Sequence, residues 1–265
     1  MDRRWSTFLS LVLIAWMVSS CGPGSPAPAT ALPPTAAPVE AVGPTRTAGT
    51  EPTPVAELPA LLGHLHWLGH ASFRFDGPPT IYLDPASPGS EKRAADIILI
   101  SHEHSDHYSP ATLKQISKPE TVIVTSPQVA AMLEKVEGIA GQVRALQPGE
   151  RVTVGDVEIE AVAAYNMDKS FHPKTAGGLG FIVTWGGERL YFAGDTSRIP
   201  EMADIECDVA LLPIDGTYTM DVAEAAQAAA DIGPKVAVPM HMRSADPEQF
   251  RSFCACRVVI MEVEP

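Results

Sequence analysis

The segment DIILISHEHSDH, residues 96–107, contains the strongest structural and chemical signals in this chain of 265 residues. Residues 96–101 form an almost continuous apolar run, which is typical of a strand that is buried on both faces. Residues 102–107 follow at once, and the pattern His102-x-His104-x-Asp106-His107 supplies three imidazoles and one carboxylate. Imidazole suits zinc and similar divalent ions, and a carboxylate adds charge neutralisation. Ligands placed directly after a buried strand predict a metal site rather than a surface cluster of histidines.

The spacing within HEHSDH indicates how many ions this loop serves. In an extended loop, alternate residues point the same way, so His102 and His104 share one direction. Asp106 and His107 then turn towards a neighbouring volume. Because all four groups would crowd a single ion, the loop predicts two adjacent metal ions.

Short apolar runs separated by turns flank this segment on both sides. Ser109-Pro110 and Ser126-Pro127 each predict the start of a helix, and an alanine-rich helix over residues 221–232 ends at Gly233. A further helix is expected over residues 247–253. The predicted strands are residues 65–68, 72–75, 80–83, 96–101, 143–146, 151–154, 157–163, 181–185, 189–192, 208–213, 235–239 and 257–263. Many strands followed by alternating strands and helices predict an α/β protein in which two packed sheets carry helices outside.

The loop SHEHSDH resembles the His-x-His-x-Asp-His signature of the metallo-β-lactamase superfamily, and the resemblance extends over residues 61–265. The order and approximate spacing of further motifs are similar to small metal-dependent hydrolases related to ascorbate-6-phosphate lactonase. These motifs are WLGHASF at 67–73, YLDP at 82–85, AYN at 164–166, FHPK at 171–174, FAGDT at 192–196, LLPIDGTYTM at 211–220 and VPMH at 238–241. The resemblance implies a four-layer αββα sandwich with two divalent metal ions, zinc in the first place and manganese or iron as alternatives.

The resemblance also implies a role for each ligand. The first metal would take His102, His104 and a third ligand from the middle of the chain, the second would take Asp106, His107 and His241, and Asp195 would bridge both. The residues themselves support Asp195, because a carboxylate straight after glycine at the end of an apolar strand is poorly explained as a turn alone. His241 also follows an apolar strand, where a purely structural histidine is the alternative.

The motifs leave two alternatives for the third ligand of the first metal. The family often has a histidine where this chain has Asn166. The nearest imidazole is His172, six residues later, and we expect it to reach the same place. The alternative is a site that lacks this ligand. With His172 as ligand, Asn166 would support the site or contact the substrate.

Three more residues are expected near the metals. Asp84 ends a strand and is predicted to hold a ligand histidine in its tautomer. His70 is expected either to line the pocket or to be satisfied within its own turn. Tyr218 either donates to the oxyanion that forms during the reaction or packs against its neighbours.

These residues predict a hydrolase. Two metals a few ångströms apart generate a hydroxide at neutral pH, and Asp106 and Asp195 would orient it. The substrate would be a small molecule with an ester, lactone or phosphodiester bond. The alternatives are an iron-dependent redox enzyme on the same fold and a non-catalytic surface lipoprotein that binds a metal or another ligand.

The N-terminal part predicts export. A basic start and an apolar run over residues 8–18 fit a signal peptide of residues 1–20, and Val18 to Gly22 (VSSCG) resembles a bacterial lipobox. Cys21 would then be lipidated and would anchor the protein to the outer face of the cell membrane; an ordinary signal peptide is the alternative. Residues 21–60 contain ten of the 25 prolines and predict an extended tether to the domain of residues 61–265.

The net charge bears on binding partners, and the cysteine spacing bears on disulfide bonds. A net charge of −13 repels polyanions, so no nucleic acid partner is expected. Cys254 and Cys256 lie two apart, which on a strand separates them by about 7 Å, too far for a disulfide without distortion. Both, like Cys207, are therefore predicted to be small buried apolar residues. No pattern in the sequence predicts an oligomeric state.

Overall fold

The computed structural model describes residues 57–264 of the chain. The predicted signal peptide, the lipidated Cys21 and nearly all of the predicted tether lie outside these residues. Among the residues described, no helix has both the length and the apolar character needed to cross a membrane.

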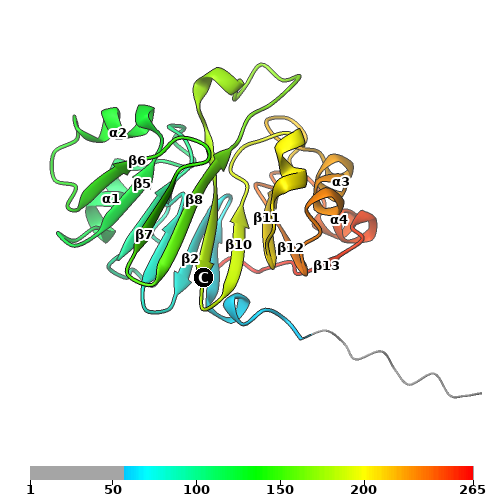
Figure 1. The fold of residues 1–265 in the computed structure, drawn as a ribbon, viewed down its shortest axis with the longest axis horizontal. Coiled ribbons are helices and arrows are strands. Elements are labelled where there is room, and N and C mark those ends of the chain that lie inside the picture. Colours follow the sequence, from blue (N-terminus) through cyan, green and yellow to red (C-terminus); the bar gives the residue numbers. More distant parts are fainter. Residues whose placement is uncertain (1–56, 265) are drawn as a thin grey trace, which may run out of the picture. The chain divides into compact units, whose positions relative to one another are not determined.

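Two β-sheets form the centre of the domain (Figure 1). The first sheet has six strands in sequential order, β1 (Leu65–Gly69), β2 (Ser72–Asp76), β3 (Thr80–Leu83), β4 (Ile97–Ile100), β5 (Val122–Thr125) and β6 (Gln142–Ala145). The second sheet has seven strands in the order β13 (Arg257–Val258), β12 (Val236–Met240), β11 (Val209–Pro213), β10 (Glu188–Phe192), β9 (Leu179–Trp185), β8 (Val157–Ala163) and β7 (Arg151–Val154). These strands and two sheets confirm the predicted mixed α/β sandwich.

Hairpins begin each sheet and parallel strands complete it. The strands β1 to β3 and β7 to β10 pair antiparallel, whereas β3 to β6 and β10 to β13 run parallel. The β9–β10 hairpin turns through Gly186 and Gly187, whose φ angles of 59° and 84° suit residues without a Cβ. Because parallel strands need long connections, helices fall between them.

The principal core lies between the sheets. Phe73 of β2 and Phe192 of β10 meet edge to face with ring centroids 6.5 Å apart, so the inner faces of the two sheets are in contact. Leu99, Phe181 and Leu211 are fully buried in the same cluster. This packed interior fixes the relative positions of the strand ends that carry the polar residues.

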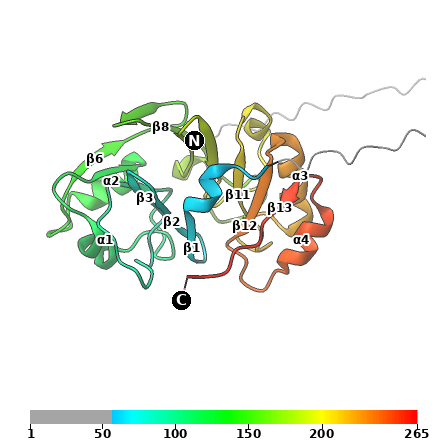
Figure 2. The same cartoon turned by 90° about the horizontal axis from the view of Figure 1, so that it is seen from below.

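Helices cover the outside, as the sequence predicts. A separate apolar cluster joins Leu113 of α1 (Pro110–Ile116) and Val129 of α2 (Pro127–Leu133) to Ile98 and Ile123 of the first sheet. The helices α3 (Val222–Ile232) and α4 (Pro247–Phe253) lie beside β11, β12 and β13 (Figure 2). Short 3-10 helices are η1 (Ala60–His64), η2 (Lys174–Ala176) and η3 (Pro200–Asp204).

The C-terminal segment differs from its prediction. Only Arg257–Val258 forms the strand β13, and the chain then leaves the second sheet instead of extending it to residue 263. The backbone N–H of Glu264 donates to the carbonyl of Trp67 in β1 over 2.8 Å. Its carboxylate lies 3.0 Å from the buried guanidinium of Arg74. The end of the chain is held by this contact with the first sheet, which shortens the strand.

Candidate metal centre

The polar residues of the predicted site collect at one end of the two sheets. The loop of residues 101–107 follows β4, Asp195 lies just beyond β10, and His241 directly follows β12. In parallel strands the carboxyl ends lie at the same edge of a sheet, and ligand sites of open α/β sheets form there. The fold therefore brings together residues that are up to 171 positions apart, from His70 to His241.

Three imidazoles form the first group. The Nδ1 atom of His104 lies 3.1 Å from Nε2 of His102 and 3.0 Å from Nε2 of His172. The carboxylate oxygen Oδ2 of Asp195 lies 3.4 Å from Nε2 of His172. Nitrogen ligands about 2.0–2.1 Å from a tetrahedral zinc ion lie roughly 3.3 Å from one another. The three nitrogens and the carboxylate thus have the spacing of ligands around one small cation.

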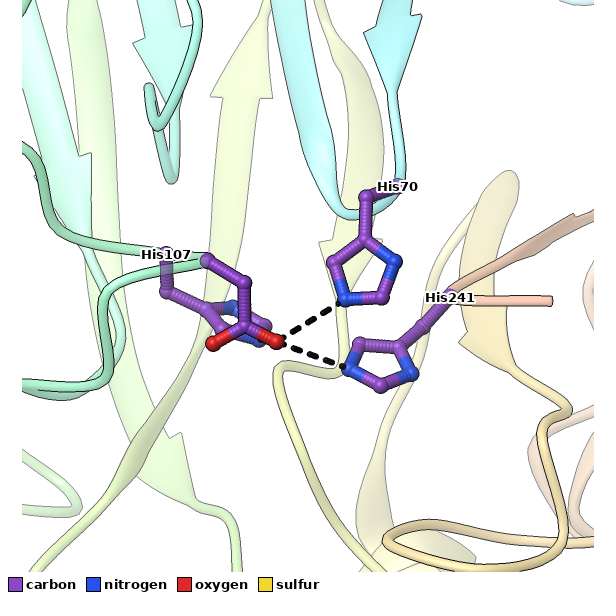
Figure 3. A group of neighbouring side chains, drawn as sticks. His70, His107 and His241 are labelled. Carbon is purple, nitrogen blue, oxygen red and sulfur yellow. Dashed lines mark hydrogen bonds and ion pairs between the residues drawn. The ribbon is translucent and has the colours of Figure 1, made fainter. Parts of the chain in front are cut away.

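A second group lies beside the first and contains His70, Asp106, His107 and His241 (Figure 3). The carboxylate oxygen Oδ2 of Asp106 lies 3.1 Å from Nε2 of His70 and 3.8 Å from Nε2 of His241. The ring of His107 approaches from the same loop as Asp106, with 4.0 Å between Nε2 and that oxygen. The group offers three imidazoles and a carboxylate for a second cation.

Asp195 connects the two groups. Its Oδ2 atom lies 3.4 Å from Nε2 of His172 and 3.3 Å from Nε2 of His241, and its Oδ1 atom lies 3.3 Å from Nε2 of His107. The side chain is 3% exposed. A buried carboxylate that faces both groups has the position of a bridging ligand.

Several buried polar atoms of the centre lack a hydrogen-bond partner among residues 57–264. Three of them face the space between the two groups, namely Nε2 of His107, Oδ1 of Asp195 and Nε2 of His241. Buried polar groups are normally satisfied, because leaving one unpaired costs free energy. Metal coordination would satisfy all three at once, so the residues present fit a pair of divalent ions.

Carboxylates behind the ligands set the orientation of the rings. Asp84 is fully buried and accepts hydrogen bonds from Nδ1 of His107 (2.6 Å) and from the backbone N–H of Ser101 (2.6 Å). The Ser101 hydroxyl donates to Asp84 and lies 2.9 Å from Nδ1 of His102. Both rings therefore turn Nε2 into the centre. Asp84 holds ligand histidines as carboxylates do behind metal sites.

Asp215 has the same position behind His241, and the sequence reasoning missed it. Its Oδ2 atom lies 3.2 Å from Nδ1 of His241, and its other oxygen accepts the backbone N–H groups of Thr217, Tyr218 and Thr219. The available signal was its place two residues after β11, where a carboxylate follows an apolar strand as Asp84 and Asp195 do.

The structure places His172 and Asn166 differently relative to the first group. His172 lies in the first group, whereas Asn166 fixes the loop that carries it. The Asn166 amide donates to the carbonyls of Phe171 (2.9 Å) and Tyr218 (2.7 Å) and accepts from the hydroxyl of Ser197 (3.0 Å). The expectation that Asn166 supports the site agrees with these contacts.

His70 points into the second group instead of being satisfied within its turn. Its backbone carbonyl accepts from the backbone N–H of His241 (3.1 Å) and from Nε1 of Trp67 (3.0 Å), which fixes the turn between β1 and β2. The two rings lie close, with centroids of His70 and His241 3.8 Å apart. His70 is therefore a candidate ligand or substrate contact at the second metal.

Tyr218 contacts the centre through its backbone. Its carbonyl accepts from Asn166 and lies 3.3 Å from Nδ1 of His172. The ring packs against Phe171, with centroids 4.7 Å apart, and lies 5.0 Å from the guanidinium carbon of Arg243. These contacts favour the packing interpretation, and oxyanion donation by the hydroxyl stays a prediction.

Backbone strain is concentrated at the centre. Among residues 57–264, the non-glycine residues with φ in the left-handed region are His70 (53°), Asp84 (41°), His172 (52°), His241 (47°) and Arg243 (48°). Such conformations cost about 1–3 kcal/mol each and occur mainly at functional sites. Four of these five residues belong to the centre or support it. The backbone conformations that orient their side chains therefore lower the stability of the fold.

Burial and nearby carboxylates have opposite effects on the pKa values of the histidines in the centre. Burial lowers the pKa of His107, but the carboxylates of Asp195 and Asp84 outweigh burial and raise it to about 10. Burial also lowers the pKa of His241, but hydrogen bonding to Asp106, Asp195 and Asp215 raises it to about 11. Burial and the nearby His107 instead lower the pKa of His102. Without metal, the carboxylates therefore hold His107 and His241 protonated.

We expect metal affinity to rise with pH for this reason. An imidazole must lose its proton to bind a metal. Below the pKa of each ligand imidazole, the metal affinity therefore rises about tenfold for every unit by which the pH increases. His107 and His241 have raised pKa values, so binding at the second group should release protons throughout the neutral range. Zinc titrations at pH 6 and pH 8 against a competing chelator, with proton release recorded, would test this. An affinity independent of pH, after correction for the chelator, would contradict it.

A small cavity opens beside the first group. It has a volume of about 80 Å³ and is lined by His102, His104, His172 and Asp195 together with Glu103 and Leu179. Phe171 and Met167, in the loop after β8, are 44% and 61% exposed. Figure 1 shows this loop rising above the strand ends. The cavity opens the first group to solvent, and Phe171 next to His172 is an exposed apolar side chain beside it.

The sequence of the domain matches a family model and known relatives. A family model described as a beta-lactamase superfamily domain matches residues 64–241. A metal-dependent hydrolase of Thermoplasma acidophilum is 33% identical over 218 residues, which cover 75% of this chain and 95% of the relative.

Solved structures show the same architecture. A crystal structure from Parabacteroides distasonis, described as a candidate metal-dependent hydrolase, is 33% identical with a TM-score of 0.68 and covers 75% of this chain and 92% of the other. A metallo hydrolase from Ignicoccus hospitalis is 25% identical with a TM-score of 0.64, over 76% of this chain and 95% of the other.

Proposed function

This chain belongs to the β-lactamase superfamily, in its metallo-β-lactamase fold, and we propose that it is a hydrolase that uses two divalent metal ions to cleave an ester, lactone or phosphodiester bond of a small molecule. The observation that carries the proposal is Asp195, a buried carboxylate within 3.4 Å of ligand nitrogens from both groups. Relatives described as metal-dependent hydrolases support the reaction class.

The residues of the two groups would hold the ions. His102, His104 and His172 would hold the first, Asp106, His107 and His241 the second, and Asp195 would be shared. When bound, such ions would lower the pKa of a coordinated water and polarise the bond under attack. Zinc suits these imidazole and carboxylate ligands best, and manganese or iron would also fit them.

The protein side chains position the reactants. Asp84 and Asp215 keep the ligand rings fixed, so no reorganisation of the centre is needed during the reaction. Asp106 is about half exposed, at 47% of its side chain, and lies beside His70 and His241, where it can help to orient the attacking water. Asp195, which is buried, is suited to orienting that water.

One nearby cation favours substrates with an anionic group. Arg243 lies two residues after His241 and against the ring of Tyr218, and it forms no ion pair with any acid among the residues described. An exposed guanidinium without an acidic partner attracts phosphate or carboxylate. Phosphodiesters and lactones with an acidic substituent are therefore the first substrates to assay.

The test combines metal content with turnover. We expect about two metal ions per chain, and hydrolysis of bis-aryl phosphodiesters or lactones that stops when a chelator removes the metal and returns when zinc or manganese is restored. Inductively coupled plasma analysis and a chromogenic assay on one sample would measure both. Two bound metals without turnover of any ester, lactone or phosphodiester would instead favour a metal-binding lipoprotein.

The cellular location remains a separate proposal. The basic start, apolar run and lipobox-like VSSCG support export and lipidation at Cys21, with residues 21–60 as a tether to the hydrolase domain of residues 61–265. Metabolic labelling with a fatty acid in the wild-type chain and in Cys21→Ala would test the anchor independently of the metal centre.

A further inference from the structure

Two cysteines near the C-terminus lie in contact with each other, and neither belongs to the candidate metal centre. The sulfur atoms of Cys254 and Cys256 are 3.0 Å apart, and both thiols are free. Cys254 ends α4, where its backbone N–H donates to the carbonyl of Phe250 over 3.0 Å. Cys256 directly precedes β13. Figure 2 shows that α4 and β13 lie at the outer side of the second sheet.

This contact overturns the expectation from the sequence. On an extended strand the two side chains would lie about 7 Å apart. The segment is instead a bend between the end of α4 and the first residue of β13, so both side chains turn to the same side. Both cysteines, like Cys207, pack against the core but are partly exposed, so the prediction that they are buried is wrong.

We propose that Cys254 and Cys256 form a redox-active dithiol, which a small-molecule disulfide converts reversibly into an intramolecular disulfide. A disulfide requires a sulfur separation of about 2.05 Å, so the two sulfur atoms must approach by only about 1 Å. The two sulfur atoms are in direct contact, and their partial exposure lets a reagent reach the pair.

The chemistry of the pair favours exchange at neutral pH. Its hydrogen bond with Cys256 lowers the pKa of Cys254 to about 7 and raises that of Cys256. The thiolate is the nucleophile in thiol–disulfide exchange, and a pKa near the ambient pH is best for it. Cys254 is therefore the attacking residue, and Cys256 is the resolving one.

The exchange is balanced with a disulfide RSSR as oxidant. The Cys254 thiolate attacks one sulfur of RSSR, forms a mixed disulfide and releases one thiolate, RS⁻. Cys256 then loses its proton to solvent and attacks the Cys254 sulfur, which releases the second RS⁻. Two protein thiols are oxidised, one RSSR is reduced to two RSH, and no other reactant is needed.

The small size of the ring argues for a reversible rather than a structural bond. The bridge would close a loop of only three residues and would therefore remove little conformational entropy from the unfolded chain. A disulfide of this kind stabilises the fold weakly, so its formation and cleavage are free to follow the redox potential of the surroundings. The pair is also outside the metal ligands, so its oxidation state can be measured separately from hydrolysis.

Trypsin isolates the pair for a direct test in the full chain. Cleavage after Arg251 and Arg257 gives the peptide SFCACR, residues 252–257, which contains both cysteines and neither Cys21 nor Cys207. The protein is incubated with oxidised glutathione, its remaining thiols are alkylated, and the peptide is weighed by mass spectrometry. We expect it to be lighter by two hydrogens and to carry no alkyl group. If the oxidised protein is treated with dithiothreitol before alkylation, the peptide should carry two alkylated thiols.

Matched variants separate the pair from ordinary thiol reactivity. Cys254→Ser and Cys256→Ser should each stop at a stable mixed disulfide with glutathione on the remaining cysteine, whereas Cys207→Ser should oxidise like the wild type. The rate of oxidation should rise about tenfold per pH unit below pH 7 and level off above it. The proposal is wrong if the wild-type peptide keeps two alkylated thiols, or retains glutathione, under conditions that oxidise other protein dithiols.

Discussion

Replacing Asp195 by alanine is expected to abolish turnover, by at least about a thousandfold, because metal-assisted charge stabilisation is worth several kcal/mol and each 1.36 kcal/mol is tenfold in rate. Asp195 is the side chain that contacts both groups, within 3.4 Å of His172 and 3.3 Å of His241. Its loss removes the shared ligand, so the metal content should also fall below two ions per chain.

The matched control for Asp195→Ala is Asp156→Ala, which removes an exposed carboxylate from the turn between β7 and β8. Turnover with the assay substrate and metal per chain should be unchanged in this control. Circular dichroism should show that both variants are folded. Full activity in Asp195→Ala would remove the dinuclear mechanism, because no other residue described occupies the position between the two groups.

Replacing His172 by alanine is expected to reduce the bound metal from two ions towards one and to lower turnover by at least about a hundredfold. Loss of a residue that only supports a metal ligand costs up to about a hundredfold, and loss of a ligand itself should cost at least as much. His172 supplies one of the three nitrogens of the first group, 3.0 Å from Nδ1 of His104. Nothing else in the described chain replaces it, since Asn166 is engaged by the carbonyls of Phe171 and Tyr218.

Two comparisons sharpen the His172 result. His66→Ala removes a histidine whose side chain is 40% exposed and lies outside the centre, so metal content and turnover should not change. Asn166→Ala removes the hydrogen bonds to the carbonyls of Phe171 and Tyr218 but keeps the imidazole of His172. Its effect on turnover should therefore be smaller than that of His172→Ala. If His172→Ala still binds two metals with unaltered affinity, the first group has been assigned incorrectly.

Much of the arrangement follows from local pattern. The apolar run before His102 becomes the fully buried strand β4, and the polar loop after it carries four of the residues that face the centre. Asp84, Asp195 and His241 likewise follow apolar strands. Because a buried parallel strand must end at the edge of its sheet, a polar residue straight after such a strand lies near its counterparts from neighbouring strands.

Loop residues were harder to place from the sequence. His172 and His70 belong to segments whose path is set by positive φ angles and by distant hydrogen bonds, such as the one from the His241 N–H to the His70 carbonyl. The periods of strands and helices carry no information about such paths. Asp215 was overlooked because its partner, His241, lies 26 residues further along the chain and meets it only after β11 and β12 have paired.

The sequence by itself therefore determined the two-sheet sandwich, the candidate metal-binding loop after β4 and the strand ends that supply Asp195 and His241, because alternation and apolar runs dictate which segments are buried and where they stop. Only the tertiary structure decided that His172 completes the first group, that His70 enters the second, and that Cys254 meets Cys256. Each of these depends on how a loop bends in space, and that bend is set by contacts with residues that are distant in the chain or by the packing of the elements on either side.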